Sequence, residues 1–144
     1  MYVRFEEYLD AASCLDYWLA KVGRFGKIAG YTSFGDIFLV DPKTGDIGML
    51  SPLKNDFVEM GYGDWDEFER EVLTNEQFVR RVLRSEDLGV LKERLGDLGE
   101  EEVFIPEPYP FIGGSGALET YAKGKVWTFV ELVGQTGHLT RGWS

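Results

Sequence analysis

The glycine-rich turn in FIPEPYPFIGGSG, residues 104–116, is the clearest candidate in this sequence for binding a phosphate. Such turns hold phosphates through backbone N–H groups, and a short helix over residues 117–121 would add its own free amides. A P-loop requires GxxxxGK[ST], whose lysine and hydroxyl GGSGALET lacks. A dinucleotide fingerprint requires GxGxxG, and the turn supplies only a GxG fragment. We therefore favour a structural turn, in which Gly113 and Gly114 allow a positive φ or a close backbone approach.

Nucleophilic catalysis would depend on two single residues, because the chain has one histidine, His138, and one cysteine, Cys14. His138 lies near the C-terminus between glycines and has no acidic neighbour, so we expect an exposed or capping role. Cys14 adjoins Leu15 on the apolar side of a predicted helix, where a cysteine is more often a small core residue. No Cys/His cluster suits zinc. We expect no catalytic residue, no metal site and no cofactor.

Carboxylates are the most abundant chemical groups, with 25 acidic against 15 basic residues and a net charge of −10. The whole imbalance lies between Asn55 and Glu107, where 16 acidic and 6 basic residues occur; the rest of the chain has 9 of each. Acid–base catalysis needs two carboxyls with separated pKa values in one cleft, whereas acids at helix starts and in loops are usually solvated. Such a segment repels nucleic acid and anionic membranes and attracts basic partners, although plain solubility is the commoner explanation of acidic surfaces.

The first 60 residues predict one helix followed by short strands. Residues 5–22 carry apolar side chains at helical spacing, and Gly23 ends the pattern. Apolar runs then predict strands over 26–31, 37–40, 47–50 and 57–60. The DPKTGD segment between the two middle runs predicts a hairpin turn, because it lacks the twelve-residue spacing and terminal glutamate of a calcium loop.

The acidic segment predicts three short helices. Asp64 and Glu67 have the spacing of a capping box, Asn75 and Ser85 are further N-cap candidates, and Gly96 is a C-terminal stop. Pro106, Pro108 and Pro110 then predict an edge strand or a polyproline-like crossing, because proline cannot donate to a sheet ladder. Apolar residues at i, i+3, i+4 and i+7 predict a last helix over 126–133.

Strands that cluster instead of alternating with helices favour an α+β fold. We expect one domain over residues 1–144, with a mainly antiparallel sheet and helices packed on one of its faces. The first residues carry acids and form no long apolar run, so we expect no secretory signal. No run of about 18 apolar residues predicts a membrane span.

The order of motifs is similar to that of a known family. FGDIFLVDPKTGDIGML, then DWDEFEREVL, then LGDLGEEEVFIPEPYPFIGGSGALE resembles the GAD-like and type VI secretion immunity-protein domain family over about residues 25–135. The matching positions are a Phe-Gly pair before the hairpin, an acidic Gly-Glu pair, and an apolar-proline segment that ends in a Gly-Gly turn, at Phe34, Gly35, Gly99, Glu100, Phe104, Pro106, Gly113 and Gly114.

The resemblance implies a cytoplasmic, non-enzymatic protein that binds a co-encoded toxin, often a nuclease, and blocks or distorts its active site. We expect an acidic and aromatic surface to make this contact, since aromatic residues ringed by charge are typical of interfaces as well as of core edges. The residues that we expect to bind the partner are Asp64, Trp65, Asp66, Glu67, Glu101, Glu102, Glu107 and Tyr109.

Two other functions remain open from the sequence. One is a non-enzymatic scaffold or regulatory module, similar in fold to the cell-wall-regulator-like superfamily but with a different ligand. The other is a small enzyme that uses the turn at residues 113–116 to hold a phosphate. The sequence does not specify the toxin or the oligomeric state.

Overall fold

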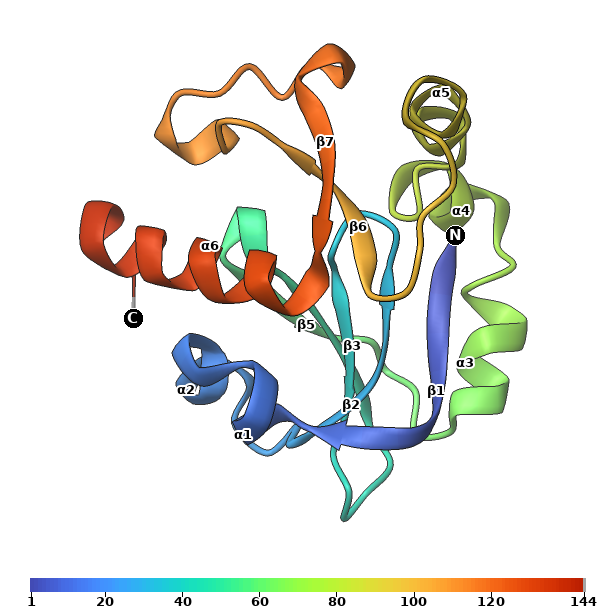
Figure 1. Cartoon of the computed structure of the whole chain (residues 1–144). Coiled ribbons are helices and arrows are strands. Elements are labelled where there is room, and N and C mark those ends of the chain that lie inside the picture. Colours follow the sequence, from blue (N-terminus) through green and yellow to red (C-terminus); the bar gives the residue numbers. More distant parts are fainter. Residues whose placement is uncertain (144) are drawn as a thin grey trace.

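The protein, described here by a computed structural model over residues 1–143, is built around a five-stranded antiparallel sheet in the order β1-β2-β3-β4-β5 (Figure 1). The strands of this sheet are β1 (Tyr2–Asp10), β2 (Lys27–Thr32), β3 (Ile37–Val40), β4 (Ile47–Ser51) and β5 (Asp56–Glu59). A second, two-stranded antiparallel sheet pairs β6 (Glu102–Pro106) with β7 (Tyr121–Lys125).

Within residues 1–143, six α-helices surround the sheets, and most of them are short. They are α1 (Ala11–Cys14), α2 (Leu19–Val22), α3 (Trp65–Glu71), α4 (Glu76–Arg81), α5 (Ser85–Leu95) and α6 (Val126–Arg141). Single turns of 3₁₀ helix complete the chain at η1 (Asp16–Trp18), η2 (Pro52–Lys54), η3 (Pro110–Ile112) and η4 (Leu118–Thr120).

The central hairpin forms as the sequence predicts. β3 and β4 pair from Ile37 opposite Leu50 to Val40 opposite Ile47, and the DPKTGD turn joins them. Gly45 in this turn has a φ of +81°, which favours glycine. β2 and β5 also occur where the apolar runs predict strands, so the expected antiparallel sheet is confirmed.

The predicted helix over residues 5–22 is wrong in its first half. Residues up to Asp10 form β1, which pairs with β2 across an irregularity between Arg4 and Leu9. Phe5 and Leu9 both pack on the core, and a separation of four residues puts two side chains on one face of either a helix or a strand. The spacing therefore did not distinguish the two structures. Helical turns begin only after Asp10.

The two faces of the large sheet carry separate cores. Ile37 and Leu39 point to one face, where α6 packs with Phe129 and Val130. Phe38, on the other face, meets α3. In Figure 1, α6, α1 and α2 lie on one side of the sheet and α3 on the other. The α+β class is confirmed, but helices cover both faces of the sheet rather than the one face that we expected.

A third cluster joins α5 to the small sheet. Phe34, from the turn between β2 and β3, packs with Leu88 and Leu91 of α5 and with Phe104 and Tyr121 of the small sheet. Of the three prolines expected in an edge strand or a polyproline-like crossing, only Pro106 lies in a strand, at the end of β6; Pro108 follows the strand and Pro110 begins η3. The partner of β6, β7, was not expected from the sequence, because YAKGK carries only two apolar residues.

Candidate interaction surface

The N-terminus of α3 presents three carboxylates to solvent. Asp64 has the extended backbone of an N-cap, and its carboxylate accepts a hydrogen bond from the Glu67 backbone N–H at 3.2 Å. Asp66 and Glu67 follow in the first turn, where negative charge is stabilised by the helix dipole. All three residues are exposed, so the capping pattern places Asp64, Asp66 and Glu67 together as expected.

Trp65 lies in the same turn but points into the protein. Its ring meets Phe38 at 5.6 Å and Phe68 at 5.4 Å between centroids, and only 6% of the residue is exposed. The indole Nε1 is buried and has no hydrogen-bond partner within residues 1–143. Trp65 is therefore a core residue in this structure, the alternative that the sequence left open, and we leave it out of the interaction surface.

α3 is held on β1 by a small polar network. Arg4 donates to Asp66 at 3.3 Å and to Glu69 at 3.2 Å, and its guanidinium lies 5.5 Å from the Trp65 ring centre. The Tyr2 hydroxyl donates to Glu69 at 2.8 Å. Burial and this carboxylate raise the pKa of Tyr2 to about 12, so the tyrosine keeps its proton. The network fixes the acidic turn against the sheet edge.

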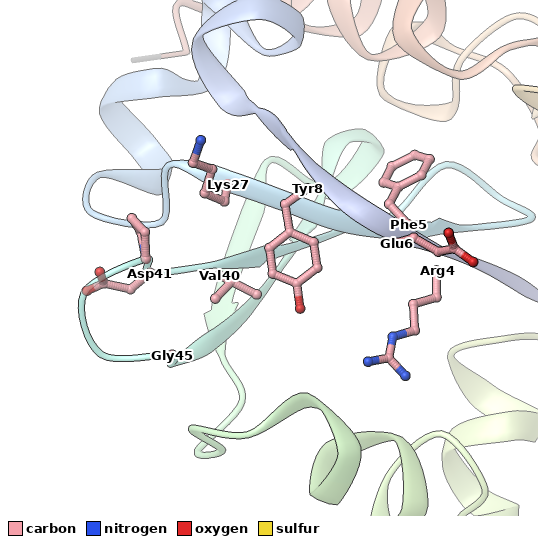
Figure 2. A pocket seen from close by; sticks show the side chains of 9 residues that line it. Arg4, Phe5, Glu6, Tyr8, Lys27, Val40, Asp41 and Gly45 are labelled. Atoms are coloured by element: carbon pink, nitrogen blue, oxygen red, sulfur yellow. The ribbon is translucent and has the colours of Figure 1, made fainter.

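An open groove of about 960 Å³ lies beside this network, between β1 and the turn of the central hairpin. In Figure 2, Tyr8 and Arg4 point from β1 to the same side, whereas Phe5 points to the opposite side. The groove thus lies on the face of the sheet that α3 covers only in part. The residues that line it are Arg4, Phe5, Glu6, Tyr8, Lys27, Val40, Asp41, Pro42 and Gly45.

Three carboxylates converge on Arg24 at the hairpin end of this groove. Arg24 donates to Asp41 at 2.6 Å and to Asp46 at 3.0 Å, and its other nitrogen pairs with Glu59. Arg24 and the Lys43 backbone N–H hold the pKa of Asp41 below its usual value. The carboxylates raise the pKa of Arg24 in turn, so the guanidinium keeps its charge. One cation among three anions leaves a negative excess.

The two acidic groups form one continuous surface, because the hairpin turn touches the loop before α3. A Cβ placed on Gly45 would lie 2.7 Å from the carbonyl oxygen of Gly63. The Ile47 N–H also donates to the Tyr62 carbonyl at 2.9 Å. We call the result the acidic surface and define it by the exposed or half-buried acids Asp46, Glu59, Asp64, Asp66 and Glu67.

The structure does not bring the other expected residues to this surface. Glu102, at the start of β6, accepts a hydrogen bond from the Gly99 N–H at 2.6 Å, and the Glu101 carbonyl accepts one from Val126 N–H at 2.7 Å. Tyr109 is half-buried and packs on Phe129, a residue of the opposite sheet face. Burial raises the pKa of Tyr109, with the nearby Glu107 adding to the rise. Glu107 itself is exposed.

Sequence reasoning missed Arg4, Arg24, Asp41 and Glu59. Asp41 was treated as a residue of the DPKTGD turn and as one of the loop acids that are usually solvated, although it is buried at 3% exposure and accepts a hydrogen bond from Arg24 at 2.6 Å. Its partners Arg24 and Glu59 come from other parts of the chain, and only strand pairing brings them together. The acid-flanked hairpin turn DPKTGD was therefore the sole signal of this charge cluster in the sequence.

The turn at residues 113–116 has the geometry of a backbone bend. Gly113 has a φ of +102°, and a Cβ on Gly114 would lie 1.9 Å from the Pro108 carbonyl oxygen. Only glycine therefore fits at Gly114. The Ala117 N–H already bonds the Ser115 hydroxyl at 3.2 Å, and the predicted helix over 117–121 is a single 3₁₀ turn, η4. These features support the structural turn that the sequence favours.

Within residues 1–143, no group of three or more His, Cys, Asp or Glu side chains is arranged to hold a metal ion. The helices in this part of the chain are too short or too polar to cross a membrane.

The single histidine and the single cysteine lie in different surroundings. His138 is half-buried, and its Nε2 lies 3.3 Å from the Tyr17 carbonyl oxygen. Burial raises the pKa of the Cys14 thiol.

Comparison with known proteins identifies a shared fold. No protein-family model matches the sequence, and no curated protein sequence matches it. Among solved structures, the chain is similar to the crystal structure of Atu4351 from Agrobacterium tumefaciens, with a TM-score of 0.65 and 14% sequence identity. The similarity covers 90% of this chain and 66% of that one. This chain therefore shares the fold of a large part of Atu4351.

Proposed function

We propose that this protein is a cytoplasmic immunity protein that binds and neutralises a cognate secreted toxin through its acidic surface. The observation that carries the proposal is the excess of carboxylates on the acidic surface, where Arg4 and Arg24 are already paired with acids. A surface of this kind attracts a partner whose contact face is basic. The order of motifs in the sequence supports the same function.

A nuclease fits this surface by its charge. Nucleases bind the phosphate backbone with lysine and arginine side chains, so the surface around their active site is positively charged. An acidic protein that occupies this surface excludes nucleic acid without any chemistry of its own. Exposed carboxylates also speed the encounter with a basic partner, because long-range attraction raises association rates.

The surface is already organised for this contact. Asp64 is fixed by its hydrogen bond to Glu67 N–H, and Asp66 by its pair with Arg4. The Arg24 cluster fixes Asp41, Asp46 and Glu59 in the same way. A surface that is ordered before binding loses less side-chain entropy on association, which favours tight binding.

Co-expression with the product of the neighbouring gene tests the proposal. We expect this protein to co-purify with that product and to protect cells that express it. Purified protein should also prevent DNA or RNA cleavage by the partner. A partner that neither binds nor loses toxicity in the presence of this protein would overturn the proposal and favour a scaffold or regulatory role.

A further inference from the structure

A second, smaller hollow lies where the three core clusters meet. It has a volume of about 140 Å³ and takes apolar walls from each cluster: Phe34 from the cluster with α5, Met49 from the α3 side, and Phe129 with Leu53 from the α6 side. Turns and short elements from distant parts of the chain close it. A hollow at the junction of several elements is a common position for a ligand site.

The polar lining of this hollow is mainly cationic, in contrast to the chain as a whole. Lys54, Arg81 and Arg84 line it together with the carboxyl group of Asp36. Neither Lys54 nor Arg81 makes an ion pair or a side-chain hydrogen bond with another residue in the described part of the chain, 1–143. Two cations are therefore free to bind an anion. We call this hollow the cationic crevice.

Arg84 is held in place at a conformational cost. It has a left-handed backbone, with a φ of 54°, although it is not glycine. Its guanidinium stacks 4.0 Å from the Phe34 ring centre, and it donates to Asp87 and to the Tyr121 hydroxyl at 3.0 Å each. Asn55, which follows Lys54, is also left-handed with a φ of 50°. Strain of this kind tends to concentrate at functional sites.

Asp36 supplies the opposite charge at the inner end. Thr32 Oγ1 lies 3.4 Å from its carboxylate. Burial raises the pKa of Asp36 to about 6, although Ser51, Lys54, Thr32 and Arg84 all favour the charged form. Near neutral pH the carboxylate compensates part of the positive charge when no ligand is present. Below pH 6 it becomes neutral, and the crevice is then more positive.

We propose that the cationic crevice binds a small organic anion, a carboxylate or phosphate group carried on a short apolar body. The anionic group would lie against Lys54, Arg81 and Arg84, and the apolar body against Phe34, Met49 and Phe129. The volume is below the roughly 300–1,000 Å³ of pockets for drug-sized ligands, so the ligand is small. This proposal is independent of toxin binding, because it concerns other residues.

Titrations followed by amide NMR test this proposal with four probes: benzoate, phenyl phosphate, inorganic phosphate and neutral benzamide. We expect benzoate or phenyl phosphate to cause saturable shifts at Asp36, Ser51, Lys54 and Arg84, and benzamide to cause none. Whichever of these two probes binds more tightly identifies the anionic group as a carboxylate or a phosphate. Inorganic phosphate should bind more weakly than phenyl phosphate, because it lacks the apolar body. Absence of saturable shifts up to about 10 mM would overturn the proposal, as would equal binding of benzamide.

Matched variants test which positive charge the bound anion requires. Arg81→Gln should weaken anion binding about tenfold, whereas Arg80→Gln, which removes the same charge from the next residue of α4, should leave it unchanged. Asp36→Asn should strengthen benzoate binding at pH 7 and weaken its dependence on pH between about 5 and 7. Equal losses in the two arginine variants would contradict the site. A loss in Asp36→Asn would contradict the anionic class of ligand. The amide spectra of each variant report whether it is folded.

Discussion

The acidic surface and the cationic crevice differ in how their charges are satisfied. On the acidic surface, Arg4 and Arg24 are each shared by two or three carboxylates, and the excess charge faces solvent. In the crevice, one carboxylate shares the lining with three cationic side chains and forms no ion pair with them, and its own burial opposes ionisation. The first arrangement suits a large basic partner that comes from solution. The second suits a small anion that enters a partly enclosed space.

The difference also concerns folding stability. Exposed ion pairs contribute about 0–1 kcal/mol each, so charges on the acidic surface can change with little cost to the fold. A half-buried carboxyl with a raised pKa lowers stability when it ionises. Charge-removing variants of the acidic surface should therefore change the unfolding free energy little, whereas neutralising the crevice carboxyl should raise it.

The largest effect should come from the core beneath the acidic surface. Trp65→Ala should lower the free energy of unfolding by about 3–5 kcal/mol, because it removes a buried ring that packs on Phe38 and Phe68. Trp65→Phe should cost much less, since the indole Nε1 has no partner to lose within residues 1–143. Urea unfolding measures both. A stable Trp65→Ala variant that has lost partner binding would mean instead that Trp65 is an interface residue.

The next largest effect is on the pH dependence of stability, which distinguishes the crevice from the acidic surface. The folded pKa of Asp36, about 6, exceeds its ordinary 3.8, so its contribution to stability is fully present below pH 4 and is lost as the pH rises through 6. Asp36→Asn should therefore raise the unfolding free energy at pH 7 by about 2–3 kcal/mol, since each pKa unit corresponds to about 1.4 kcal/mol. It should also flatten the decline between pH 4 and 6. Urea unfolding across this range checks the prediction, and a less stable variant at pH 7 would contradict it.

The smallest effect on stability should come from Asp64, where two variants distinguish helix capping from surface charge. Asp64→Ala should cost about 1 kcal/mol of unfolding free energy, because the Glu67 N–H loses its acceptor. Asp64→Asn should be nearly neutral, since asparagine also caps helices well. Both variants remove the same charge from the acidic surface. Thermal unfolding compares the two, and equal losses would show that the charge, rather than the cap, stabilises α3.

The sequence predicted the parts of the fold that depend on local signals. The hairpin turn, the capping residues Asp64 and Asn75, and the last helix all follow from a few adjacent positions. β1 and β7 were missed, because Phe5 and Leu9 fit two periods and β7 is largely polar. Such strands form because they pair with a strand that is distant in the sequence, and no local sequence pattern indicates that pairing.

The candidate sites were predicted less well for the same reason. Asp64, Asp66 and Glu67 are neighbours in the chain, and the sequence placed them together. Arg24 meets Asp41, Asp46 and Glu59 only after β2 to β5 have paired, and the crevice collects residues from positions 34 to 129. Trp65 has the composition of an interface anchor, but burial depends on the sheet that it covers.

Association kinetics with the product of the neighbouring gene test the central claim, that the acidic surface binds a basic partner. The triple variant Asp64→Asn, Asp66→Lys and Glu67→Lys keeps the cap and makes the surface more positive. A control with the same charge change, Glu86→Gln, Glu93→Lys and Glu119→Lys, alters α5 and η4.

We expect the first variant to associate at least about tenfold more slowly at low salt, with a weaker salt dependence, and the control to associate nearly as fast as the wild type. Equal rates for the two variants would contradict the claim, because net charge rather than this surface would then direct binding.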